Sequence, residues 1–134
     1  MAINYYKYYT VDTTAQICYK AIRRNIKIKK HDLIIEPSAG NGAFIKYIKK
    51  LSNNYSFYDI KPEHKEIIKK NFLKLKNANN NLHIIGNPPF GNKSSTAIKF
   101  IKHSAKLNAK TISFILPTSF NKPSFKKAFP GNYH

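Results

Sequence analysis

Acidic residues and cysteine are scarce in this sequence. Only 6 of the 134 residues are Asp or Glu, against 24 Lys and Arg, and the formal net charge is +18. This imbalance favours polyanions as partners, with nucleic acid as the default, although a lysine-rich composition can also come from an AT-rich genome. A single cysteine, Cys18, excludes an internal disulfide and cannot form a zinc site alone, so we expect it in the core.

Long apolar runs are missing as well. No run approaches the ~20 residues of a membrane span, and the first residues are too polar and aromatic for a signal peptide. The length of 134 residues and a hydrophobic fraction of 42% suit a single folded domain. We therefore expect one intracellular, cytoplasmic domain over residues 1–134, in the host cell if the gene is viral. An aromatic arm (1–12) and an irregular tail (118–134) flank its predicted elements.

Helical and strand-like patterns alternate along the chain. Apolar residues recur with helical spacing from Thr13, from Ala43 and from Ser94 to Leu107. Side chains at Asp12 or Thr13, and at Ser94 or Ser95, can cap two of these helices. Short apolar runs predict strands within residues 31–36, 56–60, 82–86 and 111–116. The alternation predicts an α/β fold, a Rossmann-like doubly wound and mostly parallel sheet of about five strands.

A glycine loop follows the first predicted strand. Glu36 ends that strand, and Ser38, Gly40 and Gly42 form the loop, where glycines let a ligand approach the backbone. Asp59 ends the next strand, where a carboxylate can accept bonds from both hydroxyls of a ribose. The loop lacks the third glycine of a dinucleotide fingerprint and the lysine of a P-loop, which disfavours NAD, FAD and ATP.

A rigid turn follows the strand at residues 82–86. Asn87, Pro88, Pro89 and Phe90 place an amide oxygen and a backbone carbonyl beside an aromatic ring. The two oxygens suit a planar NH2 group, and the ring suits stacking on an aromatic base. The turn alone is equally compatible with a simple strand cap. The five histidines show no metal-ligand spacing, so we expect no metal site and place each histidine at the surface or a strand edge.

The three motifs in this order resemble the class I S-adenosylmethionine-dependent methyltransferases, in particular those that modify the N6 amine of adenine. The resemblance implies S-adenosylmethionine as cofactor, held by the loop with Glu36 and by Asp59 at its ribose. It also implies a strand at residues 66–70 in a segment (63–76) that could otherwise be helical. The residues matched to further cofactor contacts are Tyr9, Thr10, Asn71 and Phe72; an asparagine at position 71 stands where the family has an aspartate.

The expected activity is methyl transfer to the adenine amine of DNA or RNA. Asn87 and the Pro88 carbonyl would accept bonds from the amine while Phe90 stacks on a flipped or unpaired base. Guanine-N2 and protein-glutamine methyltransferases share such a turn and remain alternatives. The family continues for about two more strands, so the sheet is expected to be truncated. An incomplete or non-catalytic module that needs a protein partner or a dimer to cover its sheet edge is the other alternative.

Overall fold

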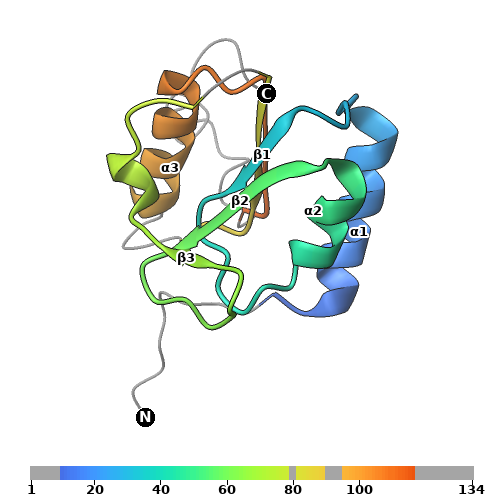
Figure 1. The fold of residues 1–134 in the computed structure, drawn as a ribbon, viewed down its shortest axis with the longest axis horizontal. Helices are drawn as coiled ribbons and strands as arrows, with labels where there is room; N and C mark the ends of the chain where they lie inside the picture. Colours follow the sequence, from blue (N-terminus) through green and yellow to red (C-terminus); the bar gives the residue numbers. More distant parts are fainter. Residues whose placement is uncertain (1–9, 79–80, 90–94, 117–134) are drawn as a thin grey trace.

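The computed structural model describes residues 10–78, 81–89 and 95–116 (Figure 1). Residues 1–9 of the aromatic arm, Phe90, Ser94 and the predicted tail lie outside the described residues. Helices and strands alternate as the sequence predicts. In chain order the elements are α1 (Asp12–Asn25), β1 (Leu33–Glu36), α2 (Ile45–Leu51), β2 (Asn54–Asp59), β3 (Ile68–Lys69), the 3₁₀ helix η1 (Phe72–Lys74), β4 (Leu82–Gly86), α3 (Ser95–Lys106) and β5 (Thr111–Phe114).

The strands form one parallel sheet. It has five strands in the order β3-β2-β1-β4-β5, and every neighbouring pair is parallel. The first strand, β1, lies in the centre. The next two strands, β2 and β3, lie on one side of β1, and β4 and β5 lie on the other side. The predicted Rossmann-like α/β fold is therefore confirmed. Such a reversal between β1 and β4 is where open α/β sheets bind ligands, at the carboxyl ends of the strands.

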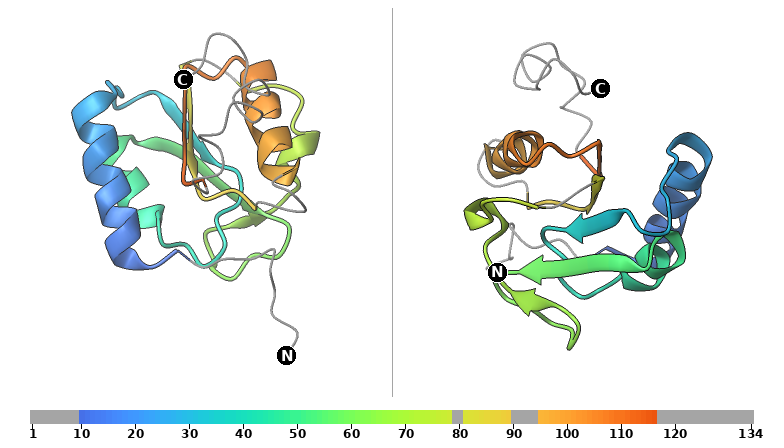
Figure 2. Two further views of the ribbon diagram at one scale, coloured as in Figure 1. Left: turned by 180° about the vertical axis from the view of Figure 1, so that it is seen from behind. Right: turned by 45° about the horizontal axis from the view of Figure 1, so that its top comes forward.

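Helices cover both faces of the sheet. In Figure 2, α1 and α2 lie on one side of the strands and α3 lies on the other. Neighbouring residues of β1 and β4 are buried in opposite layers: Ile34 and Ile85 lie in the cluster under α1 and α2, and Ile35 and Ile84 lie in the cluster under α3. Strands that are buried on both faces are mostly apolar along their whole length, which explains the nearly continuous apolar runs.

The start of α1 differs from the prediction. Val11 is the N-cap and no side chain caps the helix, so the predicted capping by Asp12 or Thr13 is wrong. The Asp12 carboxylate instead accepts bonds from Lys46 Nζ and the Tyr47 hydroxyl, both at 2.8 Å. These bonds hold the pKa of Asp12 below its usual value and join α1 to α2. A local cap is thus replaced by a tertiary contact.

The ambiguous segment contains a strand, as predicted, and not a long helix. β3 is shorter than expected, with only Ile68 and Lys69, and one turn of 3₁₀ helix follows it. The link from β2 to β3 contains no helix. The edge strand β3 is therefore very short and lies beside the carboxyl end of β2.

One prediction about burial is wrong, and the prediction of a core position for Cys18, which packs against the core cluster, holds only in part. His83 is 1% exposed, because β4 lies between β1 and β5, and its ring nitrogens lie 2.7 Å from Thr111 Oγ1 and 3.0 Å from Asp32 Oδ2. It is therefore a core histidine and not a surface one. Cys18 is only partly buried and lies on the wall of a pocket, although burial still raises the pKa of its thiol.

Within residues 10–78, 81–89 and 95–116, no group of three or more His, Cys, Asp and Glu side chains could hold a metal ion. No helix of the same residues has the length and apolar character needed to cross a membrane.

Candidate cofactor and substrate site

The residues of three predicted motifs lie together at the carboxyl end of the sheet. Glu36 ends β1, Asp59 ends β2, and Asn87 directly follows β4. Because β1 lies between β2 and β4 and all three strands are parallel, their carboxyl ends lie side by side. Residues that are up to 51 positions apart in the chain are thereby brought to the same edge.

Asp59 holds the glycine loop in place. One carboxylate oxygen accepts the Gly40 N–H and the other accepts the Lys61 N–H, each at 2.8 Å. The side chain is 6% exposed. Each oxygen of a carboxylate has a second lone pair, so Asp59 can still accept bonds from two hydroxyl groups. The residue is both a clamp on the loop and a candidate ribose ligand.

The two loop glycines serve different purposes. Gly40 has φ +56°, and a Cβ built on it would meet no atom within 4 Å, so the space in front of it is open. Gly42 has φ +84°, and a Cβ there would lie 2.9 Å from Ile45 Cδ1 and 3.0 Å from His64 Cδ2. Gly42 therefore allows α2 to pack closely behind the loop. Gly40 leaves room for a ligand, and Ser38 lies half-buried just before it.

Glu36 is a buried carboxyl group without a partner at one oxygen. It is 1% exposed, and no group among the described residues bonds to its Oε1. Burial, and then the negative charge of Asp59, raise the pKa of Glu36 well above its usual value. A buried acceptor of this kind is rare in a folded protein and is expected where a ligand supplies a donor or a positive charge.

Gly86 makes room for Glu36. A Cβ at Gly86 would lie 3.1 Å from Glu36 Cγ, so a side chain at this position would displace the carboxyl group. Gly86 is a site residue that was not predicted from the sequence. Its place at the end of a buried strand, next to Asn87, was the available signal.

Asn87 has a fixed side-chain amide. Its Nδ2 donates to Thr10 Oγ1 at 3.1 Å, while its Oδ1 is buried and has no partner among the described residues. Pro88 is buried and Pro89 is half-buried behind it. The structure thus places Thr10 against Asn87, whereas the family resemblance implied a cofactor contact for Thr10. The amide is oriented so that an acceptor is left over for a ligand.

Asn71 and Phe72 follow β3 but are not equally placed. Asn71 is half-buried, and its Oδ1 accepts the Leu73 N–H at 3.0 Å, which caps η1. Phe72 is 1% exposed and packs on the rings of Phe100 and His103, at centroid distances of 5.4 and 5.0 Å. Phe72 is therefore a core residue that anchors Asn71 and does not line the site.

Ile60 is a second residue that the sequence analysis missed. It directly follows Asp59 and is 60% exposed, one of four large hydrophobic side chains exposed among the described residues. An apolar side chain held in water beside a candidate ribose ligand offers a surface for a flat ring. The sequence feature that could have identified Ile60 is its position immediately after Asp59, the acidic residue that ends β2.

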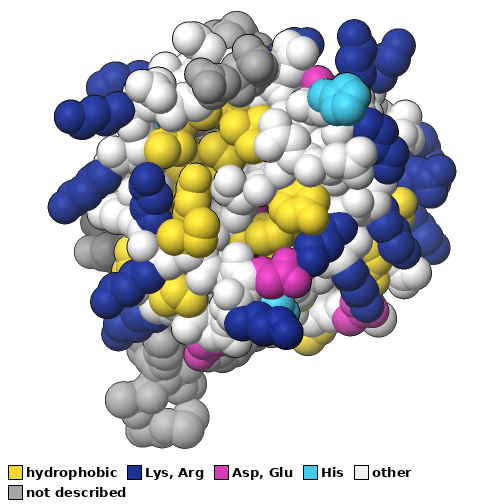
Figure 3. Space-filling view, viewed as in Figure 1, with side chains coloured by type: hydrophobic (Ala, Val, Ile, Leu, Met, Phe, Trp, Pro, Cys, Tyr) yellow, Lys and Arg dark blue, Asp and Glu magenta, His cyan; other side chains and the backbone are white. Residues whose placement is uncertain are grey.

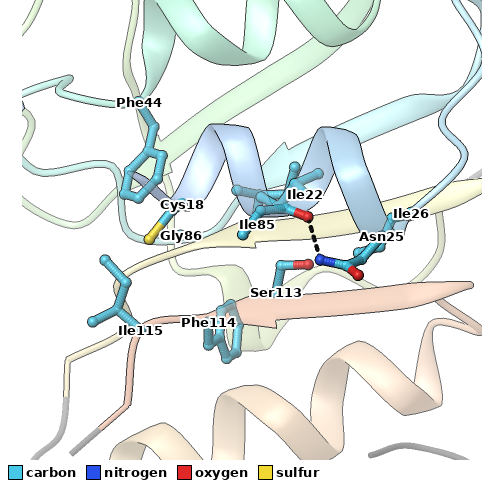
Figure 4. A pocket seen from close by; sticks show the side chains of 11 residues that line it. Cys18, Ile22, Asn25, Ile26, Phe44, Ile85, Gly86, Ser113, Phe114 and Ile115 are labelled. Atoms are coloured by element: carbon cyan, nitrogen blue, oxygen red, sulfur yellow. Dashed lines mark hydrogen bonds between the residues drawn. The ribbon is translucent and has the colours of Figure 1, made fainter. Parts of the chain in front are cut away.

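An apolar pocket lies beside this edge, between α1 and the strands β4 and β5 (Figure 4). Its volume is about 280 Å³, and of the candidate site residues discussed above only Gly86 lines it. The Asn25 amide in its wall already donates to the Ala21 carbonyl at 2.8 Å. A charged cofactor needs more polar partners than this pocket offers, so we place the candidate site at Glu36, Asp59 and Asn87.

The sequence matches no model of a known protein family, and a comparison with curated proteins gives no significant match.

Proposed function

We propose that the protein transfers a methyl group from S-adenosylmethionine to the exocyclic N6 amine of adenine in nucleic acid. The observation that carries this proposal is the Asn87 amide, whose nitrogen donates to Thr10 and whose oxygen is buried without a partner among the described residues. An oriented acceptor without a partner suits an NH2 donor. The resemblance of the three motifs to adenine methyltransferases supports the same assignment.

The residues at this edge fit the proposed cofactor. Asp59 retains acceptor capacity for the ribose hydroxyls. Glu36 Oε1, which no described residue bonds, suits the ammonium group of the methionine part. The open space at Gly40 lets a ligand approach the loop. When bound, S-adenosylmethionine would supply an electrophilic methyl group. The exposed Ile60 adds an apolar surface for the adenine ring of the cofactor.

The chain's own residues position the substrate amine. Asn87 Oδ1 and the Pro88 carbonyl accept bonds from the NH2 group, which concentrates electron density on its nitrogen. No strong base is required, since the amine becomes acidic as it is methylated and its proton can then pass to water. Phe90, outside the described residues, is proposed to stack on the base. A base in a duplex must be flipped out to reach this site.

Charge favours nucleic acid over the alternatives. A net charge of +18 suits a phosphate backbone better than a peptide, which places a protein-glutamine methyltransferase behind a guanine-N2 enzyme. The non-catalytic module remains a different class of hypothesis. Among the described residues β5 ends the sheet, and a partner chain or a dimer could cover that edge. A size measurement in solution, together with the activity assay below, separates the two classes.

The proposal is tested by incubating the protein with labelled S-adenosylmethionine and duplex DNA, single-stranded DNA or structured RNA. Nucleoside analysis of the product then identifies the methylated base. We expect N6-methyladenosine or its deoxy form in at least one sample. Labelled guanine, or labelled protein in a parallel assay with peptides, would replace the adenine assignment.

The two glycines of the loop give a matched pair of variants. Gly40→Ala and Gly42→Ala both force a left-handed conformation on alanine, which costs about 1–2 kcal/mol each. Gly42→Ala also clashes with Ile45 and His64, so we expect the lower melting temperature for it. Gly40→Ala should instead weaken cofactor binding more, on the order of tenfold, because its methyl group enters the open space. Thermal melts and calorimetric titration measure the two effects. Equal cofactor affinities in both variants would contradict a ligand in front of Gly40.

Thr10 should act by positioning Asn87. In Thr10→Val the side-chain shape is kept, but Asn87 Nδ2 loses its acceptor and the amide can rotate. We expect kcat to fall on the order of tenfold to a hundredfold, while KM for S-adenosylmethionine stays nearly constant. Thr10→Ser retains the hydroxyl and should restore kcat. A rise in KM for the cofactor with unchanged kcat would instead support a cofactor contact for Thr10.

A further inference from the structure

A second hollow lies at the opposite end of the strands from the candidate site, near the start of β1 and β2. It is formed where α1 and α2 end, and its volume is 680 Å³. α1 starts two residues after Thr10 and has 14 residues, so it extends about 21 Å away from the site at 1.5 Å per residue. The residues that line the hollow are Tyr19, Arg23, Ile26, Lys27, Ile28, Lys30, Lys50 and Leu51.

This hollow is strongly positive. It contains four cations and no acidic side chain. Within the described residues, no ion pair joins these four cations to a carboxylate; Asp12 and Glu66 instead pair with Lys46 and Lys49. Figure 3 shows the same excess over one whole face, where Lys and Arg side chains occupy both margins and acidic side chains are few. Mutual repulsion among unpaired cations is relieved when an anion binds between them.

The cations are held in position by an aromatic ring and a helix end. The Arg23 guanidinium and Lys50 Nζ both lie 5.7 Å from the centre of the Tyr19 ring. Lys30 Nζ donates to the Lys50 carbonyl at 2.9 Å. The position of Lys30 is explained by its carbonyl partner. The helix dipoles favour Arg23 and Lys50 in the last turns of α1 and α2 but supply no anion that bridges them. Arg23 and Lys50 lie over Tyr19, and neither forms an ion pair among the described residues, although Lys50 is near enough to Asp12 to lower the pKa of that carboxyl. Two cations placed in this way can bind a phosphate group.

We propose that this hollow binds a phosphate of a nucleic-acid backbone, as a second contact remote from the methyl-transfer site. The inference rests on the nucleic-acid part of the proposed function but not on methyl transfer itself. With one phosphate of each strand per 3.4 Å of duplex axis, about six nucleotides of a duplex strand span the roughly 21 Å between the two sites. A substrate of that length or longer contacts both the methyl-transfer site and the hollow. Shorter strands reach only one of them.

Binding of a fluorescent single strand of about 16 nucleotides, measured by anisotropy between about 50 and 200 mM salt, tests the proposal. The test variant is Arg23→Gln/Lys50→Gln. The control is Lys102→Gln/Lys106→Gln, which removes the same charge from two exposed side chains of α3. We expect the test variant to bind several-fold more weakly and to lower the salt slope of log Kd by about 0.7, the contribution of the one lost phosphate contact. The control should change the slope by much less.

The outcomes separate the two proposals. Equal losses in the two variants would mean diffuse attraction and would overturn the hollow as a site. If the wild-type protein does not bind the strand at all, the nucleic-acid part of the proposed function fails as well. Inorganic phosphate that displaces the strand more strongly than chloride at equal ionic strength would assign the hollow to free phosphate and overturn the backbone assignment.

Discussion

Replacing Asn87 with alanine should abolish most methyl transfer and leave cofactor binding intact. Asn87→Ala removes the oriented Oδ1 acceptor, and the loss of one such group from an active site costs about 10²–10³ in kcat. Asn87 makes its side-chain bond to Thr10, and neither Glu36 nor Asp59 bonds to it. The affinity for S-adenosylmethionine should therefore change little. Initial rates with the best nucleic-acid substrate and calorimetric titration of the cofactor measure the two quantities.

A matched control is Asn53→Ala. Asn53 is an exposed asparagine before β2, at the opposite edge of the sheet, and its loss should leave kcat unchanged. Background transfer that is equal in wild type and Asn87→Ala would contradict the catalytic assignment. A variant that loses cofactor affinity in parallel with kcat would instead indicate that Asn87 belongs to the cofactor site.

Replacing Glu36 with glutamine should stabilise the free protein while it weakens cofactor binding. Burial and the Asp59 charge raise the pKa of Glu36 in the folded state, so the folded protein keeps a proton that the unfolded chain releases. The free energy of unfolding of the wild type therefore falls as pH rises from the ordinary carboxyl pKa to the raised one. The loss is about 1.4 kcal/mol for each pH unit between these two values. Glu36→Gln has no such proton to lose.

Thermal melts across this pH range test the stability effect. We expect the two proteins to have similar stability at low pH and Glu36→Gln to be the more stable at neutral pH. Glu66→Gln is the control with the opposite sign, since its exposed carboxylate pairs with Lys49, which lowers its pKa. A wild-type stability that does not fall relative to Glu36→Gln as pH rises would contradict a raised Glu36 pKa.

Cofactor binding should show the reverse pH dependence. A positive ammonium group favours the ionised carboxylate, so the wild-type affinity should rise with pH through the raised pKa of Glu36, and binding should release a proton. Glu36→Gln should bind more weakly and release none. Calorimetry in two buffers that differ in ionisation enthalpy counts the proton. If Glu36→Gln binds as tightly as wild type at neutral pH, the carboxylate does not contact the ammonium group.

The elements and the ends of the strands could be predicted because their signals are local. Continuous apolar runs identify buried strands, and Pro88 and Pro89 restrict the backbone next to Asn87. The errors concern residues whose environment comes from distant parts of the chain. The sequence around His83 does not indicate its buried contacts with Asp32, which precedes β1, and with Thr111, which begins β5. The capping of α1 failed because Lys46 and Tyr47 occupy the Asp12 carboxylate.

By itself, the sequence determined the alternation of strands and helices, the glycine loop and the polar residues that end three strands. These features depend on side-chain period and turn chemistry, which act over a few neighbouring residues. Only the tertiary structure decided that β1 lies between β2 and β4, which brings Glu36, Asp59 and Asn87 to one edge. It also paired Asn87 with Thr10, 77 positions away, and left Asn87 Oδ1 and Glu36 Oε1 buried with no partner in the described part of the chain. Burial and hydrogen-bond partners are set by long-range packing, which no short stretch of sequence contains.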